Sequence, residues 1–139
     1  MFRLSKKADY GLIALKHLAL SDEAAHSAPE IARTYNIPPE LLAKVLQRLV
    51  RKGLLVSRAG PNGGYTLARN AKSITVIDVM EALEGPILLT PCEADDDCEQ
   101  LLLCSIRDPL RSIKQKVVDV LVSTTIQELA TPDRDSEKV

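Results

Sequence analysis

The stretch that decides the fold is residues 27–69, SAPEIARTYNIPPELLAKVLQRLVRKGLLVSRAGPNGGYTLAR, which holds two helix signals followed by two strand signals. Ser27 and Glu30 have the spacing of a capping box, and the proline between them suits a first helical turn. We therefore predict a helix that begins here and ends near Tyr35. The sequence NIPP interrupts this helix, because prolines cannot occupy a helix interior.

A second helix is predicted to start near Pro39 and to run through ELLAKVLQRLVRK. Its apolar residues recur on one face, as in a helix with one buried side; they are Leu42, Val45, Leu46, Leu49 and Val50. Gly53 follows in the position where glycine commonly ends a helix. Two short helices joined by a tight turn, the second amphipathic and basic, form a helix-turn-helix pattern.

Two short strands are predicted after the second helix, at 54–58 and 65–69, with the turn AGPNGG between them. A hairpin directly after a recognition helix is the wing of a winged helix. Its turn lacks bulky side chains, so backbone N–H groups can approach a phosphate or enter a groove. Residues 1–72, which begin with an amphipathic helix from Lys6 to about Leu20, are therefore expected to form a winged helix-turn-helix DNA-binding domain.

Composition and charge agree with a helical protein that binds a polyanion. The 139 residues are 45% hydrophobic but include no Trp, one Phe and three Tyr, which favours packed helices over a sheet sandwich. Residues 1–72 carry 12 Lys and Arg against 5 Asp and Glu, whereas residues 73–139 carry 6 against 14. The basic half suggests contact with a polyanion, and with the winged helix-turn-helix pattern the expected partner is double-stranded DNA. No apolar run is long enough for a membrane and no signal-peptide core is present, so we expect a cytoplasmic protein.

The segment 73–107 is predicted to hold one short helix and a long loop. Thr75 and Asp78 form a capping box for that helix, which ends near Leu83 before a Gly-Pro pair. The loop that follows is too long to be a simple connection, and loops of that length tend to be functional or disordered.

A long final helix is predicted within 108–130, with Asp108 as its N-cap and its end near Leu129; residues 131–139 form a flexible tail. Its apolar positions are spaced three and four apart, as in a heptad seam; with a flanking leucine they are Leu110, Ile113, Val117, Val120, Leu121 and Thr124. We expect this face to join two copies into a homodimer; the alternative is that it packs on the chain's own small domain. The expected fold is thus mainly α, a winged helix-turn-helix with a long C-terminal dimerisation helix.

The loop carries all three cysteines, Cys92, Cys98 and Cys104, spaced C-x5-C-x5-C. Zinc prefers closely spaced cysteine pairs with a fourth Cys or His ligand, and that pattern is missing here. An iron–sulfur cluster is larger, and thiolates five residues apart suit its corners. A cluster needs a fourth ligand, for which His17, His26, an acidic side chain or an exogenous molecule are candidates. A thiol redox switch, a zinc site and three unrelated cysteines remain alternatives.

Several motifs together resemble those of the bacterial iron–sulfur and nitric-oxide responsive regulators of the IscR and NsrR type, and most closely the regulators of the SUF assembly system. These motifs are residues 3–6, 9–11, 60–68, 74–76 and 81–87 and the three cysteines. The likeness spans roughly residues 1–129. It implies a homodimer that binds an operator through its second helix-turn-helix helix and wing. It also implies a cluster whose state sets DNA affinity or site choice, with repression of iron–sulfur assembly genes as the output.

The fourth ligand is where this chain departs from part of that family. IscR-like proteins carry a histidine three residues after the last cysteine, and Arg107 stands there instead. A permanently cationic side chain is no ordinary ligand. NsrR-like proteins draw an aspartate from the N-terminal helix, and Asp9 occupies the matching place, in the same or the partner subunit. The competing interpretation is that Asp9 caps the helix or pairs with Lys6 or Lys7. Three cysteines and one donor suit [2Fe-2S], which we favour, or [4Fe-4S].

The residues expected to touch DNA lie on the second helix-turn-helix helix and the wing. Glu40, Lys44 and Gln47 are best placed for base edges. Positive charge and wing contacts are expected from Arg48, Arg51, Arg58, Pro61, Asn62 and Gly63. IscR-like proteins have a Glu at the place of Ala43, so the operator of this chain need not match theirs.

Two other functions compete with a cluster-sensing regulator. A repressor of the same fold could sense redox state through metal-free thiols, and an architectural winged helix would bind DNA with little sequence preference. We do not expect an enzyme, because no nucleophile–base pair, phosphate-binding glycine loop or metal-hydrolase motif is present.

Overall fold

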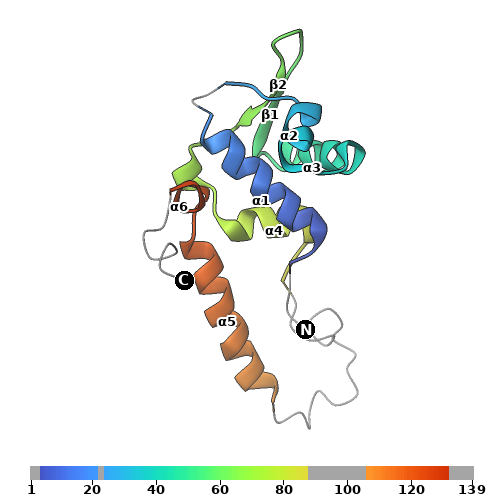
Figure 1. Cartoon of the computed structure of the whole chain (residues 1–139). Coiled ribbons are helices and arrows are strands. Elements are labelled where there is room, and N and C mark those ends of the chain that lie inside the picture. Colours follow the sequence, from blue (N-terminus) through green and yellow to red (C-terminus); the bar gives the residue numbers. More distant parts are fainter. Residues whose placement is uncertain (1–3, 22–23, 88–105, 132–139) are drawn as a thin grey trace, which may run out of the picture.

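The computed structural model describes residues 4–21, 24–87 and 106–131 and is mainly helical, with one two-stranded antiparallel sheet (Figure 1). The described elements in chain order are α1 Lys6–Ala19, α2 Ala28–Tyr35, α3 Pro39–Arg51, β1 Leu55–Arg58, β2 Gly64–Leu67, the 3-10 helix η1 Ala71–Ser73, α4 Val76–Glu84, α5 Arg107–Ser123 and α6 Ile126–Ala130. The predicted winged helix-turn-helix fold is confirmed. None of the described helices is both long and apolar enough to cross a membrane.

The helix-turn-helix forms where the sequence predicts it. The Ser27 side chain caps α2 by accepting from the backbone N–H of Glu30. The capping box is only half formed, however, because the Glu30 carboxylate lies 2.9 Å from Nδ1 of His26 instead of closing back on Ser27. Asn36 then adopts the left-handed conformation with φ 55°, which turns the chain sharply between α2 and α3.

The wing is the β1–β2 hairpin, in which Leu55 pairs with Leu67 and Arg58 with Gly64. It is slightly shorter than the predicted strands. At its base, β2 pairs with the segment before α2, since His26 and Tyr65 exchange two backbone hydrogen bonds of 3.2 and 2.8 Å. The wing is therefore anchored to the start of the helix-turn-helix as well as to its end.

The core lies between α1 and the helices packed around it. Its largest fully buried side chains come from six elements or their flanks and are Leu15, Ile31, Leu42, Leu46, Leu49, Ile74, Val79 and Ile126. Gly11 brings α1 very close to α4, because a Cβ at that position would lie 2.6 Å from Cδ1 of Leu83. The N-terminal half of α1 is thus fixed against the last turns of α4.

The prediction of one helix from Asp108 to Leu129 was wrong in two respects. The helix α5 begins at Arg107, with Ile106 rather than Asp108 as its N-cap, and ends at Ser123. A separate α6 follows, capped by the Thr125 side chain. The break arises because residues 124–126 pair with the chain before α4: Val76 N–H donates to the Thr124 carbonyl, and Ile126 N–H donates to the Ile74 carbonyl. Thr124 is therefore a linker residue and not a position on the long helix.

Candidate functional site

One exposed stripe on α3 carries four of the predicted DNA contacts. Glu40, Lys44, Gln47 and Arg51 are all exposed. At 100° per residue they fall within about 60° of one another, on the side of the helix opposite its buried leucines. Nothing in the described fold covers this stripe, so its side chains are free to enter a groove.

Arg48, also predicted as a DNA contact, is directed differently. Its Nε donates a 2.8 Å hydrogen bond to the backbone carbonyl of Ala82 in α4. Arg48 therefore ties α3 to α4, and its side chain points away from the stripe.

The wing presents its exposed residues on a turn that requires glycine. Arg58, Pro61 and Asn62 are exposed and Gly63 is half-buried. A Cβ at position 63 would lie 2.3 Å from the Arg58 carbonyl oxygen, and the Gly63 N–H donates 3.0 Å to the Gly60 carbonyl. The narrow tip is therefore a property of the backbone, and no bulky side chain fills it.

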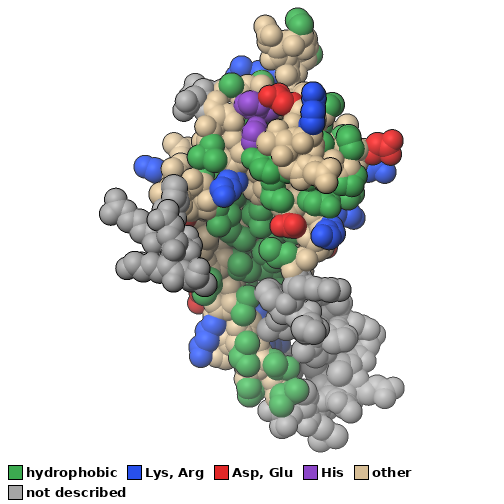
Figure 2. All heavy atoms as spheres, viewed as in Figure 1, with side chains coloured by type: hydrophobic (Ala, Val, Ile, Leu, Met, Phe, Trp, Pro, Cys, Tyr) green, Lys and Arg blue, Asp and Glu red, His purple; other side chains and the backbone are tan. Residues whose placement is uncertain are grey.

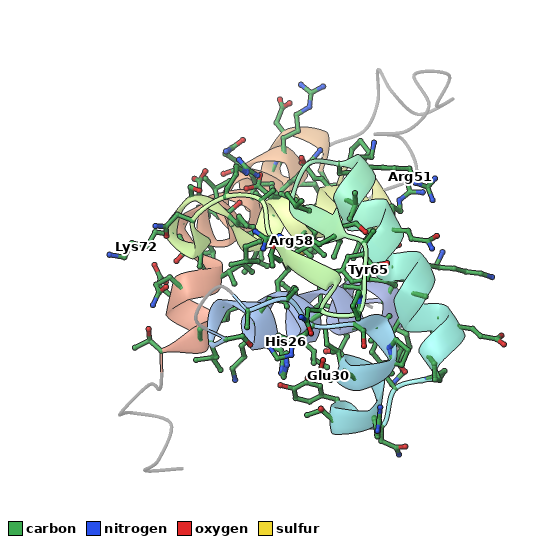
Figure 3. The ribbon with its side chains drawn as sticks, turned by 90° about the horizontal axis from the view of Figure 1, so that it is seen from above. His26, Glu30, Arg51, Arg58, Tyr65 and Lys72 are labelled. Atoms are coloured by element: carbon green, nitrogen blue, oxygen red, sulfur yellow. The ribbon has the colours of Figure 1, made fainter. Side chains whose placement is uncertain are left out.

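Seen from the side of the wing, basic residues spread across one face of the molecule. Figure 3 shows Arg51 on α3, Arg58 on β1 and Lys72 on η1 distributed over this face. Lys72 is exposed, and its backbone N–H is capped by the Asn70 side chain. Sequence analysis missed Lys72, because a single lysine in a segment without periodicity carries no signal until the fold places it beside the wing.

The predicted cluster ligands are only partly within the described residues. Cys92, Cys98 and Cys104 lie outside them. Asp9 is exposed in the first turn of α1, and its carboxylate has no hydrogen-bond or ion-pair partner in the described part of the chain. Ser5 and not Asp9 caps α1, and in the described structure no ion pair joins Asp9 to Lys6 or Lys7.

Asp9 lies near the point where the start of α1 contacts the end of α4. One turn earlier on α1, the Ser5 hydroxyl donates a hydrogen bond to the carboxylate of Glu84, the last residue of α4. The chain runs from that residue toward the cysteines. Within the described residues there is no group of three or more His, Cys, Asp or Glu side chains that could hold a metal ion.

The two histidines, considered as alternative ligands, lie together at the other end of α1. Nδ1 of His17 is 2.7 Å from the Tyr35 hydroxyl, and the rings of His17 and His26 meet edge to face with centroids 4.8 Å apart. His17 and Asp9 are eight residues apart, about 12 Å along the helix. Figure 3 shows His26 beside Glu30, and the hydrogen bond from His26 holds the pKa of Glu30 below its usual value.

This histidine pair makes stability depend on pH. Burial, and next the charge of His26, lower the pKa of His17 below its ordinary 6.5, with Glu30 opposing them. The unfolded chain therefore takes up the proton first as the pH falls. The stability that the neutral His17 contributes is fully present above about pH 6.5 and is lost as the pH falls through the folded-state pKa of His17. We expect the urea midpoint of the wild type to fall more between about pH 7.5 and pH 5.5 than that of His17→Gln. Parallel pH profiles for the two proteins would contradict this assignment.

The helix α5 carries exposed apolar side chains and projects from the body of the molecule (Figure 1). Ile113 is 50% exposed and Val120 63%, although both are large aliphatic residues. Leu110, Val117 and Leu121 on the same side are half-buried. Figure 2 shows hydrophobic side chains at the surface of this projecting region. Of the predicted dimer positions, all but Thr124 thus lie on one face of α5.

Together, the helix-turn-helix with its exposed α3 stripe and the glycine-rich wing define a winged helix-turn-helix DNA-binding protein. Residues 4–132 match the Rrf2 family, described as iron-dependent transcriptional regulators, and the chain belongs to this family. The Rrf2 proteins are transcription regulators and not enzymes, as predicted. The resemblance to IscR-type regulators is confirmed at the level of this family, whereas particular closeness to SUF regulators is not.

Alignments with individual relatives cover nearly the whole chain. This chain is 30% identical to the transcriptional regulator IscR of Pectobacterium atrosepticum over 128 residues, which are 91% of this chain and 78% of that protein. It is 35% identical to CymR of Bacillus subtilis over 130 residues, 93% of this chain and 90% of that protein. The solved structure of this CymR, described as a global cysteine regulator, superposes with a TM-score of 0.78 over 94% of this chain and 97% of that chain. The solved structure of IscR from T. potens, which is 26% identical in sequence, superposes with a TM-score of 0.75 over 99% of this chain and 90% of that chain.

Proposed function

We propose that this protein is a dimeric repressor of iron–sulfur assembly genes that senses cluster supply through an iron–sulfur cluster held by Cys92, Cys98, Cys104 and Asp9. The observation that carries the sensing part is the exposed carboxylate of Asp9, which has no partner among the described residues. It stands at the end of α1 that is hydrogen-bonded to the end of α4, the point from which the chain leads to the cysteines.

The DNA-binding part of the proposal rests on the α3 stripe and the wing. Glu40, Lys44 and Gln47 carry the acceptor and donor groups that read base edges in the major groove. Arg51 supplies a phosphate contact, and Arg58 on the wing suits a narrow minor groove. Arg48, held by the Ala82 carbonyl, serves instead as a positioning residue that transmits movement between α4 and α3.

The donor set fits an iron–sulfur cluster. Clusters are held mainly by cysteine thiolates, and these three cysteines supply three of four ligands. Both histidines are engaged with each other and with Tyr35 and Glu30, and His17 lies about 12 Å along α1 from Asp9. Asp9 is therefore the best fourth donor among the described candidates, and its exposure allows it to serve its own subunit or the partner. When bound, the cluster supplies chemistry sensitive to iron and oxidants, while the chain's residues hold it and relay its state.

The relay follows from the chain order. The cysteine-bearing segment joins α4, which Arg48 ties to α3, to α5, which carries the proposed dimer face. A change in the ligation of that segment would move α5 relative to α4. In a dimer this alters the spacing of the two α3 helices, and half-site spacing decides affinity for a two-fold symmetric operator.

The test is anaerobic purification followed by an absorption spectrum, iron and sulfide analysis, and footprinting of the holo and apo forms on promoters of iron–sulfur assembly genes. We expect a coloured protein whose footprint differs between the two forms, and loss of the footprint in Lys44→Ala. A colourless protein without iron, even after reconstitution, would refute the cluster. It would favour a metal-free thiol repressor, the alternative to which the likeness to a global cysteine regulator also leads.

The Asp9 assignment has its own prediction. We expect Asp9→Ala to weaken cluster binding by at least about tenfold, because even outer-shell partners of metal ligands contribute about 10- to 100-fold. Cluster loss under an iron chelator, followed by absorbance, measures this. Lys7→Ala, an exposed change in the same helical turn, is the matched control and should behave as the wild type. An unchanged spectrum and unchanged chelation rate in Asp9→Ala would remove Asp9 from the ligand set.

A further inference from the structure

A cavity of about 610 Å³ opens at the base of the wing, away from the α3 stripe and from Asp9. Three parts of the fold line it: the C-terminal end of α1, the β1–β2 hairpin with the residues that lead into η1, and Gln127 of α6. Its volume lies within the range of about 300–1,000 Å³ that is typical of small-molecule sites. Of its lining residues only Arg58 is also a proposed DNA contact, and none is a proposed cluster ligand.

The charge of this cavity is one-sided. Arg58 and Arg69 line it, and no aspartate or glutamate is among its lining residues. A second cavity of about 460 Å³ shares Arg69 but is also lined by Asp78 and Glu81, so its charges are balanced. Arg69 lies 3.8 Å from the Asp78 carboxylate, a long and partly exposed ion pair that holds it weakly. The first cavity therefore favours an anion, whereas the second does not.

The first cavity also contains polar groups without partners. Within the described residues, the Arg58 guanidinium makes no ion pair, and the hydroxyl of Thr66 makes no hydrogen bond although only 8% of this residue is exposed. The amide of Gln127 has a single long contact of 3.5 Å to the Thr131 hydroxyl. Arg58 is exposed and Gln127 half-buried, and the buried side-chain atom without a hydrogen-bond partner in the described structure is Nε2 of His17, so the groups around this cavity are accessible donors that a ligand could reach. A guanidinium, a hydroxyl and an amide N–H all donate to oxyanions.

Apolar side chains also line the cavity, with Leu18 from α1, Leu67 from β2 and Ala71 from η1, beside the polar Asn70. We propose that this cavity is an effector site for a small organic anion, a carboxylate or phosphate ester with a short apolar body. The oxyanion lies among Arg58, Arg69 and Thr66, and the apolar body lies against Leu18 and Leu67.

A ligand in this site would affect DNA binding because the site lies between the wing and α6. Its walls belong to the wing and to α6, and α6 directly follows α5 in the chain. A ligand that bridges Thr66 of the wing and Gln127 of α6 stabilises one orientation of the wing relative to α5. Anion binding at this site does not involve the cysteines, so the protein would respond both to a small anion and to the state of its proposed cluster.

Binding is tested on the full chain without DNA, using butyl phosphate as the probe and calorimetry together with backbone amide NMR shifts as readouts. We expect saturable shifts around Thr66, Arg69 and Gln127, with inorganic phosphate and butanol binding more weakly than butyl phosphate. Arg69→Gln and the nearly isosteric Thr66→Val should each weaken butyl phosphate at least about tenfold. Lys52→Gln, in the balanced second cavity, is the matched control and should leave binding unchanged.

Three outcomes would overturn the proposal. The first is the absence of saturable binding up to about 10 mM. The second is equal binding of inorganic phosphate, which would make the cavity a general anion site, or equal binding by the Thr66→Val protein. The third is that duplex DNA shifts these signals while free anions do not, since the cavity would then receive a backbone phosphate.

Discussion

The double variant Ile113→Glu/Val120→Glu is expected to be a monomer with operator affinity lowered by about a hundred- to ten-thousand-fold. The two side chains are 50% and 63% exposed, so glutamate there leaves the chain's own core intact. In a homodimer through α5 they meet a second copy, and two carboxylates buried at such a contact are strongly unfavourable. A monomer binds one half-site only and so loses the gain in affinity from binding both half-sites at once, which is about 10²- to 10⁴-fold.

Analytical ultracentrifugation and DNA titration at constant salt measure the two effects. Gln115→Glu is the matched control, because position 115 lies about 200° around α5 from Ile113 and is also exposed. It should remain dimeric with unchanged operator affinity. A double variant that stays dimeric would place the dimer contact on another surface and would refute the α5 face as the interface.

The elements that local sequence controls could be predicted. Thr75 and Asp78 form both halves of their capping box, with hydrogen bonds of 3.0 and 3.2 Å, and α4 begins as predicted. Helices α2 and α3 end where Asn36 and Gly53 supply positive φ. In each case the deciding interaction lies within a few residues of chain, so the sequence alone contains it.

Elements that depend on distant parts of the chain were mispredicted. The heptad spacing runs on through Thr124, but the backbone bridge between Thr75 and Thr125 ends the helix at that point. A local signal for the break was present and overlooked, since Thr125 and Glu128 have capping-box spacing. For Glu30 the competing partner is also local, since His26 lies four residues before it, but the sequence alone does not decide whether the carboxylate turns to the His26 ring or to the Ser27 backbone N–H.

The candidate site divides in the same way. Helical periodicity placed Glu40, Lys44, Gln47 and Arg51 on one exposed stripe, because a regular helix fixes their relative directions. It could not show that the Ala82 carbonyl, 34 residues further along the chain, holds Arg48. Nor could it reveal the anionic preference of the cavity at the wing base, whose lining comes from separate elements. The cysteine ligands remain a prediction.

Gly64 combines a positive φ with a close approach of backbone from another segment of the chain. Its φ is +142°, a conformation that residues with a Cβ rarely adopt. A Cβ there would lie 2.5 Å from the carbonyl carbon and oxygen of His26 and 2.8 Å from the backbone nitrogen of Ser27. These atoms belong to the backbone that pairs with Tyr65 and opens α2, so they cannot move aside as a flexible side chain would.

Gly64→Ala is therefore expected to lower the free energy of unfolding by about 2–6 kcal/mol, combining about 1–3 kcal/mol of backbone strain with a similar cost of overpacking. Against a typical total of about 5–15 kcal/mol, this is a large loss. Gly53→Ala is the control, because Gly53 also has positive φ, +80°, but no atom lies within 4 Å of its Cβ position. It should cost only about 1 kcal/mol. Urea denaturation measures both variants, and equal losses would show that the wing base is not packed against the start of α2 as tightly as the structure describes.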